Sequence, residues 1–252
     1  MMKPWRMVMV VGICLLLMGM LPQAWAEGPP LDAARVLAQV DRKLRPEAFE
    51  SFAQVTIQLA NGRVSQFSLY GVGEGGKRSA VLILAPEALL GRAILRVDDG
   101  VWMHVPGELE LRTVTLLQSL TGGLLTNADL LLTDYAADYK ATLVENRGEE
   151  IVLELTPQSD KLPYGRQVMR VDRKRMLPNS ISQFSAGGSL VKTLTFEQYS
   201  ESVGFARPTL VRVTSGDNKS SATWQLTALK SRTFPPEAFS KAFLPKVGSL
   251  FK

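Results

Sequence analysis

Short runs of β-branched, aromatic and aliphatic residues follow one another along most of this chain, at spacings of roughly ten residues. Turn-forming pairs separate them, among them Asn61-Gly62, Gly75-Gly76, Asp99-Gly100 and Gly216-Asp217. Each run has the length of one β-strand, and consecutive strands joined by short turns pair in antiparallel fashion. The pattern therefore predicts a mainly β fold with few helices.

Two sets of runs, separated by a leucine-rich stretch, are predicted to be strands. The first set comprises Ala53–Ala60, Val64–Gly71, Arg78–Leu84, Ala93–Val97 and Val101–Val105, and the second comprises Tyr139–Val144, Glu150–Thr156, Gln167–Asp172, Leu177–Ser185, Leu190–Tyr199, Arg207–Ser215 and Ser221–Lys230. Strongly twisted sheets of about ten strands tend to curl or split. We therefore expect a curled antiparallel sheet, a half-open β-barrel of about 11–12 strands.

The first predicted hairpin shows how the strands are expected to pair. Val55 and Ile57 alternate with polar residues, and beyond the turn the alternating apolar pair is Phe67 and Leu69. The two apolar faces coincide only if the loop has an odd number of residues. A three-residue loop, Asn61-Gly62-Arg63, is therefore predicted, with Ile57 opposite Phe67 and Val55 opposite Leu69.

Three segments carry helical signals. Apolar residues recur at helical spacing over Leu31–Leu44, which predicts one amphipathic helix. The leucine-rich stretch Thr113–Tyr139 is expected to form a loop with a short helix, capped by Thr126 or Asn127. Pro235–Phe239 is expected to form a short helical turn that plugs one end of the sheet.

An excess of apolar residues is the main clue to function. A strand with one solvated face alternates polar and apolar residues, whereas Ala80–Leu84 is apolar throughout. Two interpretations remain open. The sheet wraps around an apolar cavity, or it encloses an ordinary core that helices close.

The N-terminal segment has the features of a secretory signal peptide. Lys3 and Arg6 precede an apolar run, and Ala24-Trp25-Ala26 offers a cleavage site. We expect residues 1–26 to be a signal peptide and residues 27–252 to form a single domain in the periplasm. A retained N-terminal anchor is the alternative.

Candidate catalytic and metal-binding residues are sparse. Cys14, the only cysteine, lies in the predicted signal peptide, so the mature chain is expected to have no disulfide, thiol nucleophile or thiolate metal site. His104, the only histidine, stands in a predicted strand without a hydrolase motif around it. The acidic clusters lack the spacing of a calcium loop, and Asp98-Asp99-Gly100 is predicted to be a turn. We therefore expect neither an enzyme nor a metal or cofactor site.

The charge pattern gives no sign of a nucleic-acid partner. The formal net charge of +5 falls to +3 when Lys3 and Arg6 are removed, and charges of both signs are interspersed along the chain. The one dense basic run, Arg170–Arg175, fits a solvated turn or a site that attracts anionic headgroups. Strand alternation places Arg170 and Asp172 on one face, which favours the solvated turn.

Several segments, in order along the chain, resemble the outer-membrane lipoprotein-sorting protein family, relatives of the periplasmic lipoprotein carrier LolA. They are Asn61-Gly62-Arg63, Leu95–Pro106, Leu125–Leu130, Leu153–Pro157, Val171-Asp172 with Leu177-Pro178, and Leu190–Tyr199, which has the form L-x-K-T-L-x-F-x-x-Y. The resemblance implies a LolA-like half-open barrel whose helices lid an apolar cavity for acyl chains. It also implies work between an inner-membrane transporter, of the ABC or RND type, and an outer-membrane acceptor.

These observations together predict a monomeric carrier for the acyl chains of a lipoprotein or another lipid, because each buried methylene gains about 0.8 kcal/mol. The predicted lining combines inward-facing and lid residues: Val55, Ile57, Phe67, Leu69, Val81, Ile83, Trp102, Leu124, Leu125 and Leu130. Two other classes of function fit the sequence. One is an envelope-transporter subunit that docks without binding cargo, and the other is a periplasmic lipid hydrolase that uses His104.

Overall fold

The computed structural model describes residues 31–251, with the exception of 120, 122 and 203–204. The predicted signal peptide, residues 1–26, lies outside the described residues. Within the described part of the chain, no helix has both the length and the apolar character that a membrane-spanning helix requires.

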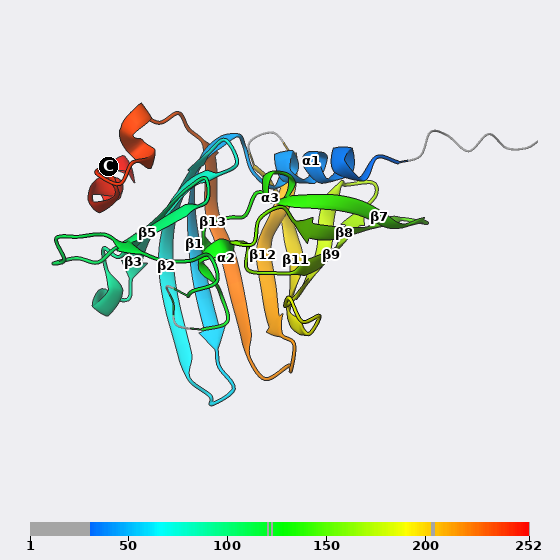
Figure 1. The fold of residues 1–252 in the computed structure, drawn as a ribbon, viewed down its shortest axis with the longest axis horizontal. Helices are drawn as coiled ribbons and strands as arrows, with labels where there is room; N and C mark the ends of the chain where they lie inside the picture. Colours follow the sequence, from blue (N-terminus) through cyan, green and yellow to red (C-terminus); the bar gives the residue numbers. More distant parts are fainter. Residues whose placement is uncertain (1–30, 120, 122, 203–204, 252) are drawn as a thin grey trace, which may run out of the picture. The chain divides into compact units, whose positions relative to one another are not determined.

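One antiparallel sheet dominates the fold (Figure 1). Its strands are β1 (Ala48–Gln58), β2 (Val64–Glu74), β3 (Arg78–Ala85), β4 (Ala93–Val97), β5 (Gly100–His104), β6 (Arg112–Thr113), β7 (Tyr139–Arg147), β8 (Glu150–Pro157), β9 (Arg166–Asp172), β10 (Leu177–Phe184), β11 (Leu190–Ser202), β12 (Phe205–Ser215) and β13 (Ser221–Ser231). The predicted curled sheet is confirmed. Over the described residues it has 13 strands, and the strand that the sequence pattern did not predict is the two-residue β6.

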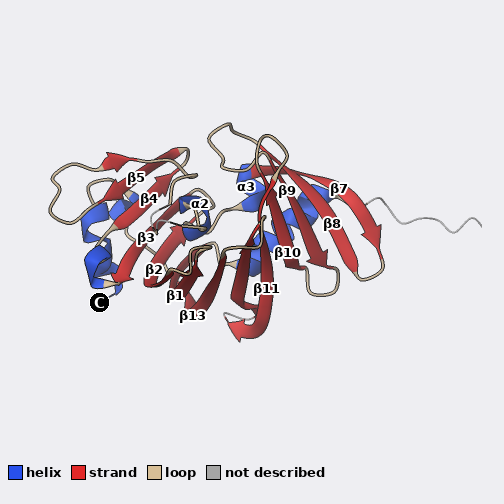
Figure 2. Cartoon of the chain, turned by 90° about the horizontal axis from the view of Figure 1, so that it is seen from below, coloured by secondary structure: helices blue, strands red, loops and turns tan. Residues whose placement is uncertain are grey.

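The strand order shows how the sheet is assembled from two wings. It runs β6-β5-β4-β3-β2-β1-β13-β12-β11-β10-β9-β8-β7. Strands β1 to β6 form one wing and β7 to β13 form the other, and the pairing of β1 with β13 joins the wings. Short helices accompany the sheet: α1 (Ala33–Leu44), α2 (Asn127–Leu130), α3 (Tyr135–Asp138), and the 3-10 helices η1 (Glu87–Leu89), η2 (Pro236–Phe239) and η3 (Leu244–Phe251). In Figure 2, α2 and α3 lie within the curve of the sheet.

Helix α1 follows the predicted amphipathic pattern and begins two residues later than predicted. Its N-cap is Asp32, whose side chain accepts a hydrogen bond from the backbone N–H of Ala34 at 3.0 Å. Val36, Leu37 and Val40 are buried. This apolar face packs against the β7-to-β13 wing, where α1 contacts β7, β10 and β12.

The inner face of the sheet carries the larger hydrophobic core. We call it the inner core, and its members include Val55, Ile57, Phe67, Leu69, Val81, Ile83, Ile94, Ile151, Leu153, Leu155, Met169, Val171, Ile181, Leu194 and Val213 from the strands, with Val36, Leu37 and Val40 from α1 and Leu125 and Leu130 from the α2 region. Helix α1 and the segment between β6 and β7, which contains α2, therefore cover the concave side of the sheet.

The hairpin between β1 and β2 has a different register from the predicted one. Val55 lies opposite Phe67, whereas the prediction paired Phe67 with Ile57 and Leu69 with Val55. The turn is centred one residue earlier than predicted, and Gly62, with a φ of 81°, occupies the left-handed position that glycine favours. A slip of two residues keeps each side chain on its face. The inward-facing set of this hairpin is therefore as predicted, although its partners are not.

A second core covers the outer face of β2, β3 and β4. We call it the outer core: Tyr70, Val72, Ala80, Leu82, Ala93, Leu95, Ala238, Phe239, Leu244, Val247 and Leu250. It explains why Ala80–Leu84 is apolar throughout, because both faces of β3 are covered by protein. The helical turn predicted at Pro235–Phe239 is present as η2. Its predicted role as a plug at one end of the sheet is wrong, because η2 and η3 pack against the outer faces of β3 and β4.

Candidate functional site: an apolar cavity beneath the helices

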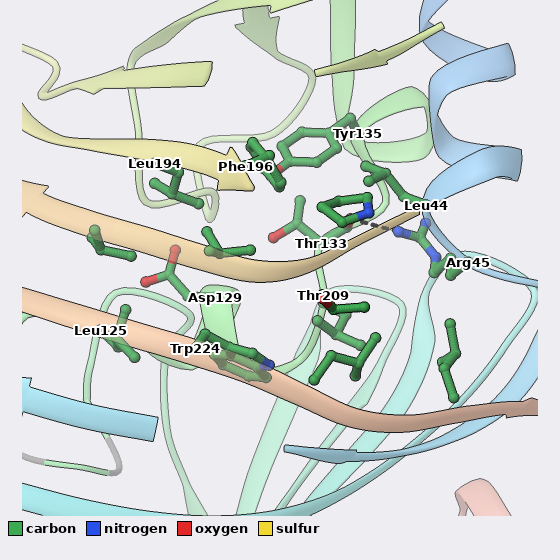
Figure 3. A pocket seen from close by; sticks show the side chains of 16 residues that line it. Leu44, Arg45, Leu125, Asp129, Thr133, Tyr135, Leu194, Phe196, Thr209 and Trp224 are labelled. Carbon is green, nitrogen blue, oxygen red and sulfur yellow. Dashed lines mark hydrogen bonds between the residues drawn. The ribbon is translucent and has the colours of Figure 1, made fainter. Parts of the chain in front are cut away.

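An apolar cavity of about 140 Å³ lies between the inner face of β11 to β13 and the segment that runs from α2 to α3. The sheet contributes Leu194, Phe196, Pro208, Thr209, Val211, Val213, Trp224, Leu226 and Leu229, the end of α1 contributes Leu44 and Arg45, and the covering segment contributes Leu125, Asp129, Leu132, Thr133 and Tyr135. Figure 3 shows Leu125 and Asp129 at one end of this group and Leu44 and Arg45 at the other. The walls are apolar and the charged groups stand at the two ends.

A buried ion pair holds α2 over one end of the cavity. Lys192 of β11 donates its Nζ to Asp129 Oδ2 and, at 3.0 Å, to the carbonyl oxygen of Leu124. The side chain of Lys192 is 0% exposed and that of Asp129 is 8% exposed. Asp129 Oδ2 also accepts a hydrogen bond from the backbone N–H of Thr126 at 2.6 Å, which completes the capping box of α2. One carboxylate therefore both caps the helix and fixes it to the sheet.

A second polar cluster fixes α1 to α3 at the other end of the cavity. The Asp41 carboxylate accepts hydrogen bonds from the backbone N–H groups of Tyr135 (3.2 Å) and Ala136 (2.6 Å). Arg45 lies 2.8 Å from Asp134 Oδ2 and donates to the carbonyl oxygen of Thr133, also at 2.8 Å. The segment between α2 and α3 is thus held at both of its ends.

Burial raises the pKa of Asp41 to about 7, from the usual 3.8. The neighbouring Asp134 also raises this pKa, whereas Arg45 and the two backbone N–H donors lower it. Desolvation of the carboxylate is the largest of these influences. The contact between α1 and α3 therefore includes a carboxyl group that titrates near neutral pH.

A third ion pair connects the two wings of the sheet. Arg96 of β4 donates Nη1–H and Nη2–H to the two carboxylate oxygens of Asp138, each at 2.6 Å, and both side chains are buried. Asp138 ends α3 and directly precedes β7. Paired guanidinium and carboxylate groups of this geometry fix orientation as well as distance. The covering helices are therefore also tied to the β1-to-β6 wing.

The residues predicted to line a cavity occupy three different settings. Leu125 lines the cavity described above. Leu124 is half-buried and packs against the inner core, and seven others are buried within that core: Val55, Ile57, Phe67, Leu69, Val81, Ile83 and Leu130. Trp102 packs against the outer core, and Lys241 Nζ lies 4.0 Å from the centre of its ring. Its predicted inward orientation is wrong, because Trp102 pairs with the outward-facing Leu95.

The cavity walls come mainly from β11, β12 and β13, which the sequence interpretation did not select. One signal was available in the pattern of β11. Lys192, Leu194 and Phe196 share a face, and a lysine within an apolar face indicates a buried charge that needs a partner. The partner, Asp129, lies 63 residues earlier in the chain, and no local pattern connects the two.

Around the cavity, the residues with described positions form no comparable arrangement of catalytic or metal-binding groups. His104 ends β5, where it pairs with Ala93. Among the residues that the structure describes, no group of three or more His, Cys, Asp or Glu side chains is placed to hold a metal ion. The cavity itself offers apolar contact rather than a constellation of acids, bases and nucleophiles.

Several solved structures share this fold. A LolA superfamily protein from Nitrosomonas europaea has 23% sequence identity and a TM-score of 0.78, over 84% of this chain and 100% of that chain. A DUF1329 family protein from Desulfovibrio piger has 22% identity and a TM-score of 0.72, over 84% and 97%. A domain described as an outer membrane lipoprotein-sorting protein, from Vibrio parahaemolyticus, has 18% identity and a TM-score of 0.71, over 84% and 98%.

The sheet and its covering helices thus define a LolA-like fold, which confirms the resemblance found in the sequence. At these identities the likeness concerns the fold alone. A family model with the description "Uncharacterized protein" matches residues 75–246, and the chain belongs to that family. No curated protein matches the chain.

Proposed function

We propose that the protein is a periplasmic carrier that binds an acyl chain of a lipid or lipoprotein and carries it between an inner-membrane transporter and the outer membrane. The apolar cavity on the inner face of β11 to β13 is the observation that carries this proposal. Ligand sites are typically apolar hollows with a few polar groups at defined positions. The LolA-like fold and the predicted signal peptide support the same function.

The size of the cavity indicates how cargo enters. Its volume of about 140 Å³ is close to that of an engineered apolar cavity of about 150 Å³ that binds benzene. A complete acyl chain is several times longer than benzene, so the cavity holds only part of it as it stands, and we propose that the covering segment between α2 and α3 moves to admit the rest. Leu132, which lines the cavity in this segment, has a φ of 53°, a conformation that a leucine rarely adopts.

Native mass spectrometry of protein purified from the periplasm tests the proposal directly. We expect a bound amphiphile in the wild type and its loss in Val211→Trp, which fills the cavity from β12. The matched control is Val191→Trp, because Val191 is exposed on β11, where the alternation with the buried Lys192 turns it to the outer face. Circular dichroism and urea unfolding identify variants that fold.

Three results would overturn the proposal. The first is a folded Val211→Trp variant that retains as much lipid as the wild type. The second is equal loss of lipid from both variants. The third is wild-type protein that carries no amphiphile under any purification, which would favour the class of docking subunits that bind no cargo.

A further inference from the structure

Basic side chains from three segments gather at the end of the sheet covered by α1. Arg173, in the turn between β9 and β10, donates Nε–H to the carbonyl oxygen of Gly148 at 2.9 Å and Nη2–H to Asn146 Oδ1, both in the β7–β8 hairpin. Lys43 of α1 donates Nζ to the carbonyl oxygen of Arg175 in the β9–β10 turn. These contacts hold the helix and the two turns next to one another.

The cations of this region exceed its anions. We define the basic patch by the six side chains Arg35, Arg42, Lys43, Arg147, Arg173 and Lys174. Two further arginines are neutralised locally, because Arg170 pairs with Glu150 and Arg175 pairs with Asp172. The remaining acidic side chains of these segments at the surface are Asp32, Glu145 and Glu149. The patch is therefore net positive by three charges.

The patch adjoins the cavity. Lys43 directly precedes Leu44 and Arg45, which line one end of the cavity. On the other side, Arg175 follows Lys174 of the patch, and its guanidinium lies 4.1 Å from the centre of the Tyr199 ring. Tyr199 is on β11, three residues after Phe196 of the cavity wall. Whatever binds the patch is thus held beside the cavity.

The arrangement of the charges indicates the kind of partner. The six cations are spread over a helix face and two turns, so they match a surface that repeats its negative charge in two dimensions better than one small anion. Val144, an apolar side chain that is 60% exposed, lies on β7 three residues before Arg147. Clusters of four to eight basic residues with neighbouring apolar side chains are typical of protein surfaces that bind anionic lipid.

We propose that the α1 end of the protein docks on an anionic lipid bilayer through the basic patch. The bilayer then lies beside the end of the cavity marked by Leu44 and Arg45. Docking brings the cavity next to the membrane that supplies or receives the acyl chain. The transfer of an acyl chain, unlike the docking, rests on the proposed function.

Vesicle flotation tests the docking. The protein exported to the periplasm is mixed with vesicles of phosphatidylcholine alone, or of phosphatidylcholine and phosphatidylglycerol in equal parts. Wild-type protein is expected to float only with the anionic vesicles. In salt of about 1 M the Debye length falls to about 3 Å, and the binding is expected to be lost.

Two double variants locate the binding surface. Arg147→Glu combined with Lys174→Glu reverses the charge of two exposed side chains of the patch. Since each basic side chain changes membrane partition roughly fivefold, the partition coefficient is expected to fall by about 25-fold or more. Arg63→Glu with Lys219→Glu makes the same change of charge on exposed turns at the opposite end of the sheet, and is expected to leave partition within about twofold.

Equal loss of flotation in both double variants would overturn the proposal, because net charge rather than the patch would then govern binding. Equal flotation of the wild type and the patch variant would also overturn it, as expected if the patch binds an acidic protein. Bound lipid is measured by native mass spectrometry on the same preparations. A patch variant that keeps its lipid but does not float separates failure of docking from failure of the carrier function.

Discussion

Lys192 and Asp129 form a buried ion pair between β11 and α2. The two residues belong to two of the segments on which the family resemblance depends, Leu190–Tyr199 and Leu125–Leu130. The pair therefore gives a physical reason why these segments occur together in one chain. It anchors the short helix that covers the cavity, and α2, with four residues, is too short to be stable without such an anchor.

Replacing Lys192 by Met is expected to lower the free energy of unfolding by about 3–5 kcal/mol, because the Asp129 carboxylate is then buried without its cation. Urea unfolding measures the change. Arg212→Met is the control, since Arg212 pairs with Glu197 on the surface, and its loss should cost less than about 1 kcal/mol. Equal effects of the two substitutions would show that Lys192 is not the anchor.

The outer core is expected to depend on the C-terminal helices. Leu244→Asp places a charge within the outer core, and should lower the free energy of unfolding by about 3 kcal/mol or more. Leu109→Asp is the matched control, because Leu109 is fully exposed. Thermal unfolding of the two variants, measured side by side, tests whether η3 is part of the folding unit. A Leu244→Asp variant as stable as the control would contradict this assignment.

Asp41 is expected to make stability depend on pH near neutrality. Its pKa is raised to about 7 in the folded state, so the folded protein binds the proton more tightly than the unfolded chain. Its contribution to stability is therefore present at about pH 4 and is lost as the pH rises through about 7, by an amount on the order of a few kcal/mol. Urea midpoints across this range should fall less steeply in Asp41→Asn than in the wild type.

Asp172 provides a contrast of opposite sign. The backbone N–H of Arg175 holds the pKa of this carboxyl below its usual value. Its small contribution to stability is present above the unfolded pKa and is lost as the pH falls through the folded pKa. Asp172→Asn should therefore leave the loss of stability between about pH 5 and pH 7 unchanged, because Asp172 stays ionised throughout this range. If Asp41→Asn and Asp172→Asn reduced this pH-dependent loss of stability equally, Asp41 would be ruled out as its source.

Arg96→Lys should loosen the contact between the wings although it keeps the charge. A lysine cannot make the two parallel hydrogen bonds that Arg96 donates to Asp138. We expect a loss of about 1.5–3 kcal/mol, together with faster hydrogen exchange in β7, which follows Asp138. Arg166→Lys, at the exposed pair with Glu154, should change neither quantity by a comparable amount.

The sheet was predictable because its signals are local. Alternation of apolar and polar residues marks each strand, and helical spacing marks α1. The register of the first hairpin was not predictable. Loops of odd length centred on Asn61 or on Gly62 satisfy the same alternation, and the two registers they give differ by two residues. The turn geometry at Gly62 decided between them.

The cavity was only partly predictable from the sequence. An apolar inner face was expected, but the position of the cavity depends on which strands the segment from α2 to α3 covers, and this follows from contacts between residues far apart in the chain. The apolar run Ala80–Leu84 was interpreted as a sign of a cavity or of a core closed by helices, and its actual cause, cover of the outer face of β3, comes from 3-10 helices more than 150 residues later in the chain. The anchors at Lys192 and Arg96 depend on partners 63 and 42 residues away.

The pairing of β1 with β13 also determines when the sheet can be completed during folding. Thr227 donates its hydroxyl hydrogen to the carbonyl oxygen of Phe52, 175 residues earlier. During synthesis, the strands of each wing can pair within neighbouring hairpins, but the pairing of β1 with β13 must wait until nearly the entire chain has been made. Contacts of such large sequence separation slow folding. The unfinished wings therefore expose open strand edges to their surroundings, and this interval is when a chaperone would protect the chain most.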